Sequence, residues 1–273
     1  MKMVQLARAE LFRAARRRSG WVLLLLPALV AAVRIAFSAV AEVDPDAAEL
    51  GNNGFAPLAD GLRTGGAVLT LVVLLLGALS MVRDREIGAL RLLSTMASKG
   101  TIFASKLLVL TVLLALGGLL LVGGCVAVAA WQYDFGPLVE DGFEIATAAE
   151  LWRDTAQAFA AGCCAWWAAG CLGLSLSAAT SNVGAATLLA VVPVLLLDFF
   201  GELAQDLWHS LFLSHLPLLS GEAALARLPD ICRGFSDVFL AEGEILQACR
   251  VSLVQGLGLA IVGWLVTRSR SAA

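Results

Sequence analysis

Long apolar segments, separated by shorter polar ones, run through the whole sequence. A helix needs about 20 mostly apolar residues to cross the hydrocarbon core of a bilayer. No ten-residue alternation of apolar and polar positions, which is typical of a membrane-spanning strand, appears. We therefore predict six transmembrane helices, over Gly20 to Val40, Gly65 to Val82, Leu107 to Trp131, Thr155 to Ala179, Val183 to Phe200 and Val251 to Thr267.

The composition supports this interpretation. Of the 273 residues, 59% are hydrophobic and only 15% are charged, and the mean hydropathy is +0.85. A chain of this kind is too apolar for an ordinary water-soluble domain. The predicted fold class is an all-α integral membrane protein, with a six-span domain over 20–267 between an N-terminal helix at 1–19 and a tail at 268–273.

Charged residues are divided unevenly between the two sides of the predicted bundle. Three segments together carry thirteen basic residues and only three acids, whereas the alternate segments are rich in aspartate and glutamate. Cytoplasmic loops carry the excess of lysine and arginine, so we predict that both termini and 83–106 are cytoplasmic and that 201–250 is extracytoplasmic. The thirteen are Lys2, Arg8, Arg13, Arg16, Arg17, Arg18, Arg83, Arg85, Arg91, Lys99, Lys106, Arg268 and Arg270.

Residues 1–19 have the pattern of an amphipathic helix, with apolar positions at helical spacing and basic residues opposite. Such a helix is expected to lie on the cytoplasmic leaflet. Two alternatives are that these basic residues only orient the first span, or that a signal peptide is cleaved near Ala39-Val40-Ala41. We expect the segment to be retained.

The segments expected outside the membrane differ in length. Glu42 to Arg63 contains turn-forming residues and is predicted to be a short loop. The longer segment 201–250 has helical spacing of apolar residues over stretches too short to cross a bilayer. We predict one or two short helices there, which dip into or lie on the outer leaflet or form a surface subdomain without a mechanistic role.

Small residues recur every four positions along the predicted fourth span. A stripe of this kind allows two helix backbones to approach closely. It is therefore predicted to pack on another helix, either within the chain or across a dimer axis. The stripe consists of Ala161, Ala165, Ala169, Gly173 and Ser177.

A few polar residues are candidates for chemistry. Arg34 in the first span is expected to line a substrate path or to extend to the outer headgroups. Cys232 and Cys249 share the predicted outer side, where an oxidising compartment would allow a disulfide. His209 and His215 could bind copper or zinc, but they are six positions apart, which is a poor spacing for one face of a helix. The other cysteines lie in spans and are expected to be inert.

No enzymatic motif is apparent. A Walker A sequence needs a lysine after glycine to bind phosphates, and no lysine in this chain follows one. Ser175 in the fourth span has no histidine in any predicted span to act as a base. We therefore predict no catalytic residue, no metal site and no cofactor in this chain.

The segment Arg83 to Lys106 is the one long charged interruption between two predicted spans, and it reads RDREIGALRLLSTMASKGTIFASK. It resembles the cytoplasmic loop of the type 2 ABC exporter permeases, in which Arg-Glu-x-Gly precedes a leucine pair, a Ser/Thr and Ser-Arg. Ala89, Met96 and Ser105 depart from that pattern, which has Thr, Pro and Gly there. The matching residues are Arg85, Glu86, Gly88, Leu90, Leu92, Leu93, Thr95, Ser98, Lys99 (for Arg) and Lys106.

The resemblance implies a permease subunit in the cytoplasmic (inner) membrane of a bacterium. A separate ABC ATPase subunit would bind ATP and Mg²⁺, a second copy of the chain or a paralogue would complete the pathway, and nucleic acid would have no part. A short coupling helix, from Glu86 to Ser94 with Leu90 and Leu93 on one side, would fit a cleft in the ATPase. The residues assigned to coupling are Arg85, Glu86, Gly88, Leu90, Leu93, Thr95, Ser98 and Lys99.

Two alternatives to this interpretation are kept. The segment can be an ordinary basic loop that only fixes the orientation of the spans. The whole chain can be a membrane scaffold or assembly factor that works without an ATPase and presents its acidic outer segments to a periplasmic partner. Among exporters, the sequence does not select a substrate.

Overall fold

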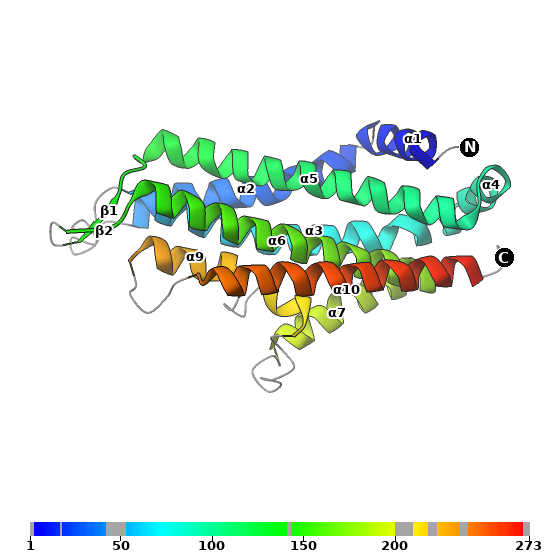
Figure 1. Cartoon of the computed structure of the whole chain (residues 1–273). Coiled ribbons are helices and arrows are strands. Elements are labelled where there is room, and N and C mark those ends of the chain that lie inside the picture. The colour runs from blue at the N-terminus through cyan, green and yellow to red at the C-terminus, as the bar shows by residue number, and fades with distance from the viewer. Residues whose placement is uncertain are drawn as a thin grey trace.

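The computed structural model describes residues 3–16, 18–41, 53–140, 143–199, 210–217, 223–234 and 240–269, and that part of the chain is almost entirely helical (Figure 1). The predicted all-α class is confirmed, apart from one small antiparallel hairpin of β1 (Leu138–Glu140) and β2 (Phe143–Ala146). The helices are α1 (Met3–Arg16), α2 (Arg18–Ala41), α3 (Phe55–Glu86), α4 (Ala89–Met96), α5 (Lys99–Gln132), α6 (Ala148–Ala179), α7 (Val183–Phe199), the 3-10 helix η3 (Phe212–His215), α9 (Ala224–Cys232) and α10 (Glu242–Ser269).

Five helices, α2, α3, α5, α6 and α10, are long and apolar enough to cross a membrane. They include five of the six predicted spans, so the chain is a multi-pass membrane protein. The predicted fifth span corresponds to α7, which is apolar but has only 17 residues. At 1.5 Å per residue it extends about 26 Å, short of the about 30 Å of a hydrocarbon core. The sixth crossing therefore stays a prediction.

The long helices begin earlier than hydropathy predicts. Residues Phe55–Arg63 were expected in a loop, but they form the first turns of α3. The Asn53 side chain accepts a hydrogen bond from the Phe55 amide at 3.1 Å, and the Phe55 ring packs against Phe135 and Trp152. These contacts start the helix at its polar end, where no apolar run marks it.

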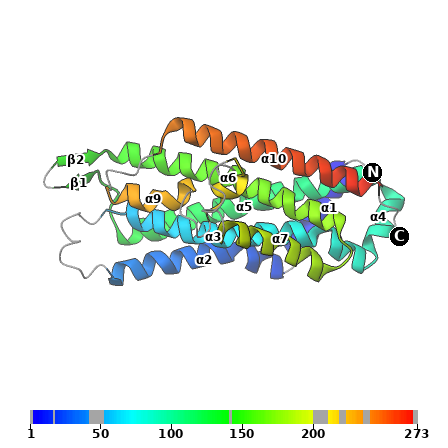
Figure 2. The same cartoon turned by 90° about the horizontal axis from the view of Figure 1, so that it is seen from below.

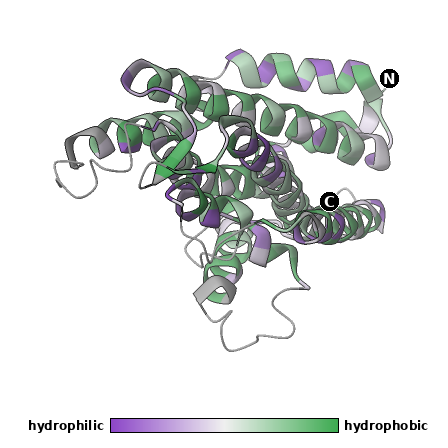
Figure 3. Cartoon of the chain, turned by 60° about the vertical axis from the view of Figure 1, so that its left-hand side comes forward, coloured by the Kyte–Doolittle hydropathy of each residue, from purple (hydrophilic) through white to green (hydrophobic). Residues whose placement is uncertain are grey.

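The helices form an elongated bundle with two distinct ends (Figure 1). Helix α3 is central and contacts α2, α5, α6, α7 and α9. Helix α10 packs along α6, while α2 packs along α3 and α5 on the opposite side (Figure 2). Hydrophobic residues run along the lengths of the helices, as expected for surfaces that face lipid or other helices (Figure 3). Helix α1, helix α4 and the C-terminal end of α10 lie together, and we call this the α4 end.

The small-residue stripe of α6 packs within the chain: Gly173 and Ser177 face α3, whereas Ala161 packs with Ile245 and Ala248 of α10. The backbones of α3 and α6 are so close that a side chain at either glycine would clash. A Cβ atom added to Gly173 would lie 2.6 Å from the Leu74 carbonyl oxygen, and one added to Gly77 would lie 2.6 Å from the Gly170 carbonyl oxygen. The Ser177 hydroxyl accepts hydrogen bonds from two α3 amides, at 2.9 and 3.0 Å. The stripe is buried throughout, so the alternative of a dimer contact through this face is wrong, and the stripe cannot contact a substrate.

Short helices occur in the predicted outer segment 201–250, at the positions that the structure describes. The segment at η3 is held beside the middle of α10, because Gln255 accepts from the Phe212 amide at 2.9 Å and donates to the Ser210 carbonyl at 2.6 Å. Helix α9 packs on α3 and α6, with Leu225 and Leu228 buried. The segment also contains the first turns of α10, which was predicted to begin only at Val251.

Candidate functional site

Helix α4 is joined to the bundle by two-residue connections on both sides. Gly88 has φ 74° and ψ 0°, a left-handed conformation that favours glycine. After α4, Ala97 is extended, and the Ser98 hydroxyl accepts a hydrogen bond from the Thr101 amide at 3.3 Å, which caps α5. A short helix in this segment is as predicted, but it begins at Ala89. Glu86 ends α3, so the expected start at Glu86 is wrong.

The exposed apolar face of α4 is not the one with Leu90 and Leu93 that the resemblance to the permease loop predicts. Leu90 is half-buried and packs on the cluster around Met81 and Phe103, and Leu93 is half-buried as well. Leu92 and Met96 are 66% and 58% exposed and lie four residues apart on one face of the helix. The apolar surface available to a partner therefore belongs to Leu92 and Met96, whereas Leu90 attaches α4 to the bundle.

Arg85 and Glu86 connect α3 to the turn between α6 and α7. The Arg85 guanidinium donates to the carbonyl oxygens of Thr180 and, at 3.4 Å, Ala178, at the C-terminal end of α6. The Glu86 carboxylate accepts from the Val183 amide at 3.0 Å, at the first residue of α7. A cation at a helix C-terminus and an anion at a helix N-terminus both complement the helix dipoles. These two matching residues therefore fix the ends of two helices.

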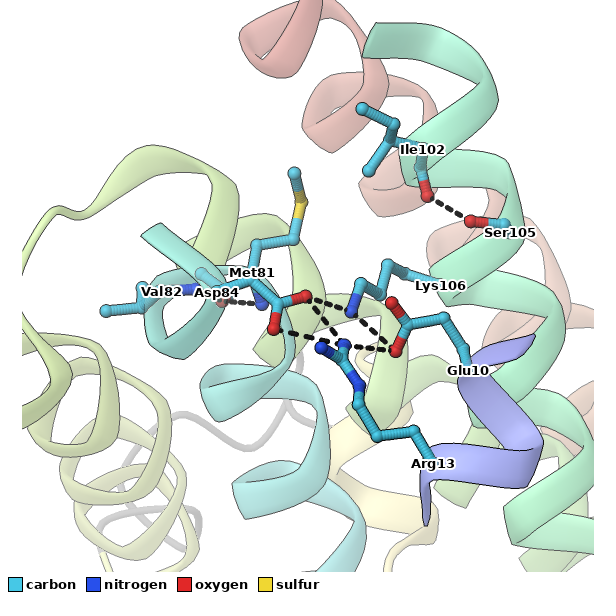
Figure 4. Close-up of polar contacts among 9 residues, drawn as sticks. Glu10, Arg13, Met81, Val82, Asp84, Ile102, Ser105 and Lys106 are labelled. Carbon is cyan, nitrogen blue, oxygen red and sulfur yellow. Dashed lines mark hydrogen bonds and ion pairs between the residues drawn. The ribbon is translucent and has the colours of Figure 1, made fainter. Parts of the chain in front are cut away.

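Four charged side chains from three helices form a buried cluster beside this turn (Figure 4). Asp84 of α3 and Lys106 of α5 are only 3% and 6% exposed and form an ion pair. The Lys106 amine also lies 3.0 Å from Glu10 of α1, and the Arg13 guanidinium lies 2.5 Å from Glu10 and 3.1 Å from Asp84. We call these residues the charged cluster. It attaches α1 to the ends of α3 and α5.

The charged cluster also changes the pKa of Arg13. Burial alone would lower the pKa of its guanidinium, but the hydrogen bond to Glu10 and the negative charge of Asp84 outweigh it, so the pKa is raised above its ordinary value. Arg13 therefore stays charged over the whole physiological range. Of these residues, Glu10, Arg13 and Asp84 were counted only for topology and Lys106 also as a match to the permease loop, since nothing in the sequence shows which helix ends meet.

The remaining predicted residues of this segment have local roles. Thr95 is exposed and its hydroxyl donates to the Leu92 carbonyl at 2.7 Å, while Lys99 begins α5. Ser105, one of the departures from the family pattern, is fully buried and donates to the Ile102 carbonyl at 2.7 Å. The segment 83–106 is therefore mostly helical, and its outermost part is α4 with its two connections.

A variant at the end of α3 tests the contact of Glu86 with the α6–α7 turn. In Glu86→Ala the Val183 amide loses its acceptor, so we expect amide exchange at 182–184 to become about five-fold faster or more, from the loss of a charge-assisted hydrogen bond. Hydrogen exchange with mass spectrometry measures this. Glu144→Ala, an exposed glutamate in β2, is the control and should leave these amides unchanged. Equal protection in the two variants would show that Glu86 does not hold the turn.

At the opposite end of the bundle, Arg34 takes part in a second set of ion pairs. Its guanidinium lies 3.1 Å from the buried Asp60 carboxylate, and Arg233 lies 2.6 Å from the same oxygen. Sequence analysis considered only a substrate path or the lipid headgroups for Arg34. The pairing was missed because Asp60 was placed in a loop rather than on the buried face of α3.

The proposed disulfide between Cys232 and Cys249 is not present, since both cysteines are free. Cys232 is buried in the main core, and the Cys249 thiol lies beside that of Cys164. Burial raises the pKa of the Cys232 thiol to about 12, so its thiolate is scarce at neutral pH. His215 lies in η3, and His209 lies outside the described residues. Within the described ranges no group of three metal-ligating side chains occurs.

Comparisons with known proteins give no relative. No protein-family model matches the chain, and no curated protein is significantly similar to it.

Proposed function

We propose that this protein is the transmembrane permease subunit of an ATP-driven ABC exporter, and that α4 is the contact for a separate ATPase subunit. The observation that carries the proposal is the exposed apolar face of α4, formed by Leu92 and Met96 on a short helix at one end of the bundle. Apolar residues at such a polar end would face water unless another protein covered them. The resemblance of 83–106 to the permease loop supports the same partner.

The connections around α4 provide a route for coupling. Two residues separate α4 from α3 on one side and from α5 on the other. The last turn of α3 binds the α6–α7 turn through Arg85 and Glu86, and binds α1 and α5 through Asp84. A displacement of α4 by the ATPase would therefore move the ends of five other helices together. Coupling between a soluble motor and a membrane domain needs such packed, stiff contacts.

The proposal also covers the assembly. ATP and Mg²⁺ would be bound by the ATPase, and a second copy of this chain, or a paralogue, would complete the pathway in a bacterial cytoplasmic membrane. Because the stripe of α6 is buried within the chain, the second subunit would pack on other surfaces. Exposed apolar side chains on α2, α5, α7 and α10 are available to it and to lipid.

A pull-down tests the proposal. The tagged chain is extracted from its host in mild detergent, and bound proteins are identified by mass spectrometry and assayed for vanadate-sensitive ATP hydrolysis. We expect an ATPase subunit with a Walker A motif to be retained by the wild type. In Leu92→Glu with Met96→Glu its recovery should fall about 50-fold or more, since each buried apolar side chain contributes about 1.5–3 kcal/mol.

The matched control is Phe143→Glu, an equally apolar and exposed position (78%) in the hairpin at the far end of the bundle. It should retain the ATPase as the wild type does. If the wild type elutes without any ATPase, or only with periplasmic proteins, the exporter proposal is wrong and the scaffold alternative replaces it.

A further inference from the structure

A cavity of about 350 Å³ lies between α1, α2, α3 and α5 at the α4 end. This volume falls within the range of about 300–1,000 Å³ that is usual for small-molecule sites. The charged cluster forms part of its wall (Figure 4). The Trp21 indole also lines it, and its N–H donates to the Ala15 carbonyl at 2.8 Å, which links the start of α2 to the end of α1.

The wall of the cavity changes from charged to apolar along its length. On α5 it runs from Lys106 through Val109 and Leu113 to Leu116, and on α3 it runs from Arg83 back to Leu76. Leu116 follows Lys106 by ten positions, which corresponds to about 15 Å of helix. That is about half of the about 30 Å hydrocarbon thickness. The cavity thus has the depth of one leaflet, with its charges at the end where the leaflet would meet water.

Two groups in the wall lack partners within the described part of the chain. Arg83 is exposed and forms no ion pair there, while Arg13 and Lys106 are paired with Glu10 and Asp84. The charged end therefore has a net charge of +1. The buried hydroxyl of Ser80, one turn deeper on the same face of α3, makes no hydrogen bond. An anionic group with oxygen atoms would complement Arg83, and an ester oxygen would suit Ser80.

We propose that the cavity is a binding site for one anionic phospholipid, with its phosphate at Arg83 and one acyl chain between α2, α3 and α5. The apolar wall, the leaflet depth and the unpaired cation each match a part of such a molecule. Neither an ATPase nor a second subunit is needed, so the proposal is independent of the exporter function.

Photolabelling tests the proposal. The full chain is placed in phosphatidylcholine nanodiscs that contain a small fraction of phosphatidylglycerol with a diazirine on one acyl chain, and labelled residues are mapped by mass spectrometry. We expect labels on cavity residues such as Leu23, Val109 and Leu113. Arg83→Gln should reduce them about five-fold, from the loss of one cation near the headgroup. Arg91→Gln, an exposed arginine on α4 outside the cavity, should not.

A second pair of variants tests the acyl-chain part. Leu113→Trp should fill the cavity and remove its labels, whereas Leu119→Trp, at an exposed position (70%) on the same helix, should leave them. The proposal is overturned if labels occur only at outward positions such as Leu119, or if photoreactive phosphatidylcholine labels the cavity equally well. If Leu113→Trp does not fold, the comparison of Arg83→Gln with Arg91→Gln still decides the result.

Discussion

Replacing Gly173 by leucine is expected to lower the free energy of unfolding by about 3 kcal/mol, at the upper end of the usual effect of overpacking. A Cβ there would lie 2.6 Å from the Leu74 carbonyl oxygen and 2.9 Å from the Ala78 amide nitrogen. Both are backbone atoms of α3, which cannot move aside as a flexible side chain would. The two helices would have to separate at this contact.

Thermal unfolding in detergent measures this effect, and the melting temperature should fall by about 6 to 12 °C. Gly77→Leu should behave in the same way, since Gly77 and Gly173 face each other. Gly123→Leu is the control, because a Cβ at Gly123 on α5 would meet no atom within 4 Å. If Gly123→Leu lowers the melting temperature by as much, the destabilisation comes from replacing a helical glycine by leucine and not from the contact of α3 with α6.

Asp84→Asn is expected to destabilise the protein by about 3–5 kcal/mol, the usual consequence of removing one member of a buried ion pair. After this change, Glu10 is the only carboxylate partner of Lys106 and Arg13 among the described residues. Lys106 is only 6% exposed. Release of α1 should accompany the loss, because α1 is held through the same charges. Trypsin cleavage at Arg13 and Arg16 should therefore become faster.

Two further variants separate the pairing from the loss of charge. Glu244→Gln removes a carboxylate from an exposed pair with Arg227, and surface pairs contribute only about 0–1 kcal/mol. In the double variant Asp84→Asn with Lys106→Met, the loss should be smaller than the sum of the single losses, since no buried lysine is left unpaired. Additive losses would contradict a direct interaction of the two residues.

Hydropathy predicts the middles of the long helices well and their ends poorly. The apolar periodicity and length of α2, α3, α5, α6 and α10 are visible in the sequence because lipid and core both require apolar side chains. Residues Phe55–Arg63 are helical but were assigned to a loop, because the segment Glu42 to Arg63 contains turn-forming and charged residues. The charge of Asp60 is paired with arginines of other segments. Hydropathy cannot distinguish a charge that is paired inside the bundle from one in water.

The site at the α4 end was predicted in part. The motif indicated a short helix, and spacing indicated that α6 packs closely on another helix. In an eight-residue helix with leucines or methionine on all sides, however, periodicity does not show that Leu92 and Met96 face outward while Leu90 faces the bundle. The charged cluster was missed for a related reason: its residues come from three helices, and their sequence positions carry no information on which ends meet.

The central position of α3 has a consequence for biosynthesis. Several of its polar contacts are made with later parts of the chain: Thr70 with Trp166, Val82 with Ser177, and Asp60 with Arg233, which follows 173 residues later. Chains are synthesised at about 5–20 residues per second, so α3 waits about 9 to 35 s before its last ion pair forms. During that time the nascent helix lacks these three contacts. Recognition by membrane chaperones or quality-control proteases is therefore expected to concentrate on this stage of translation.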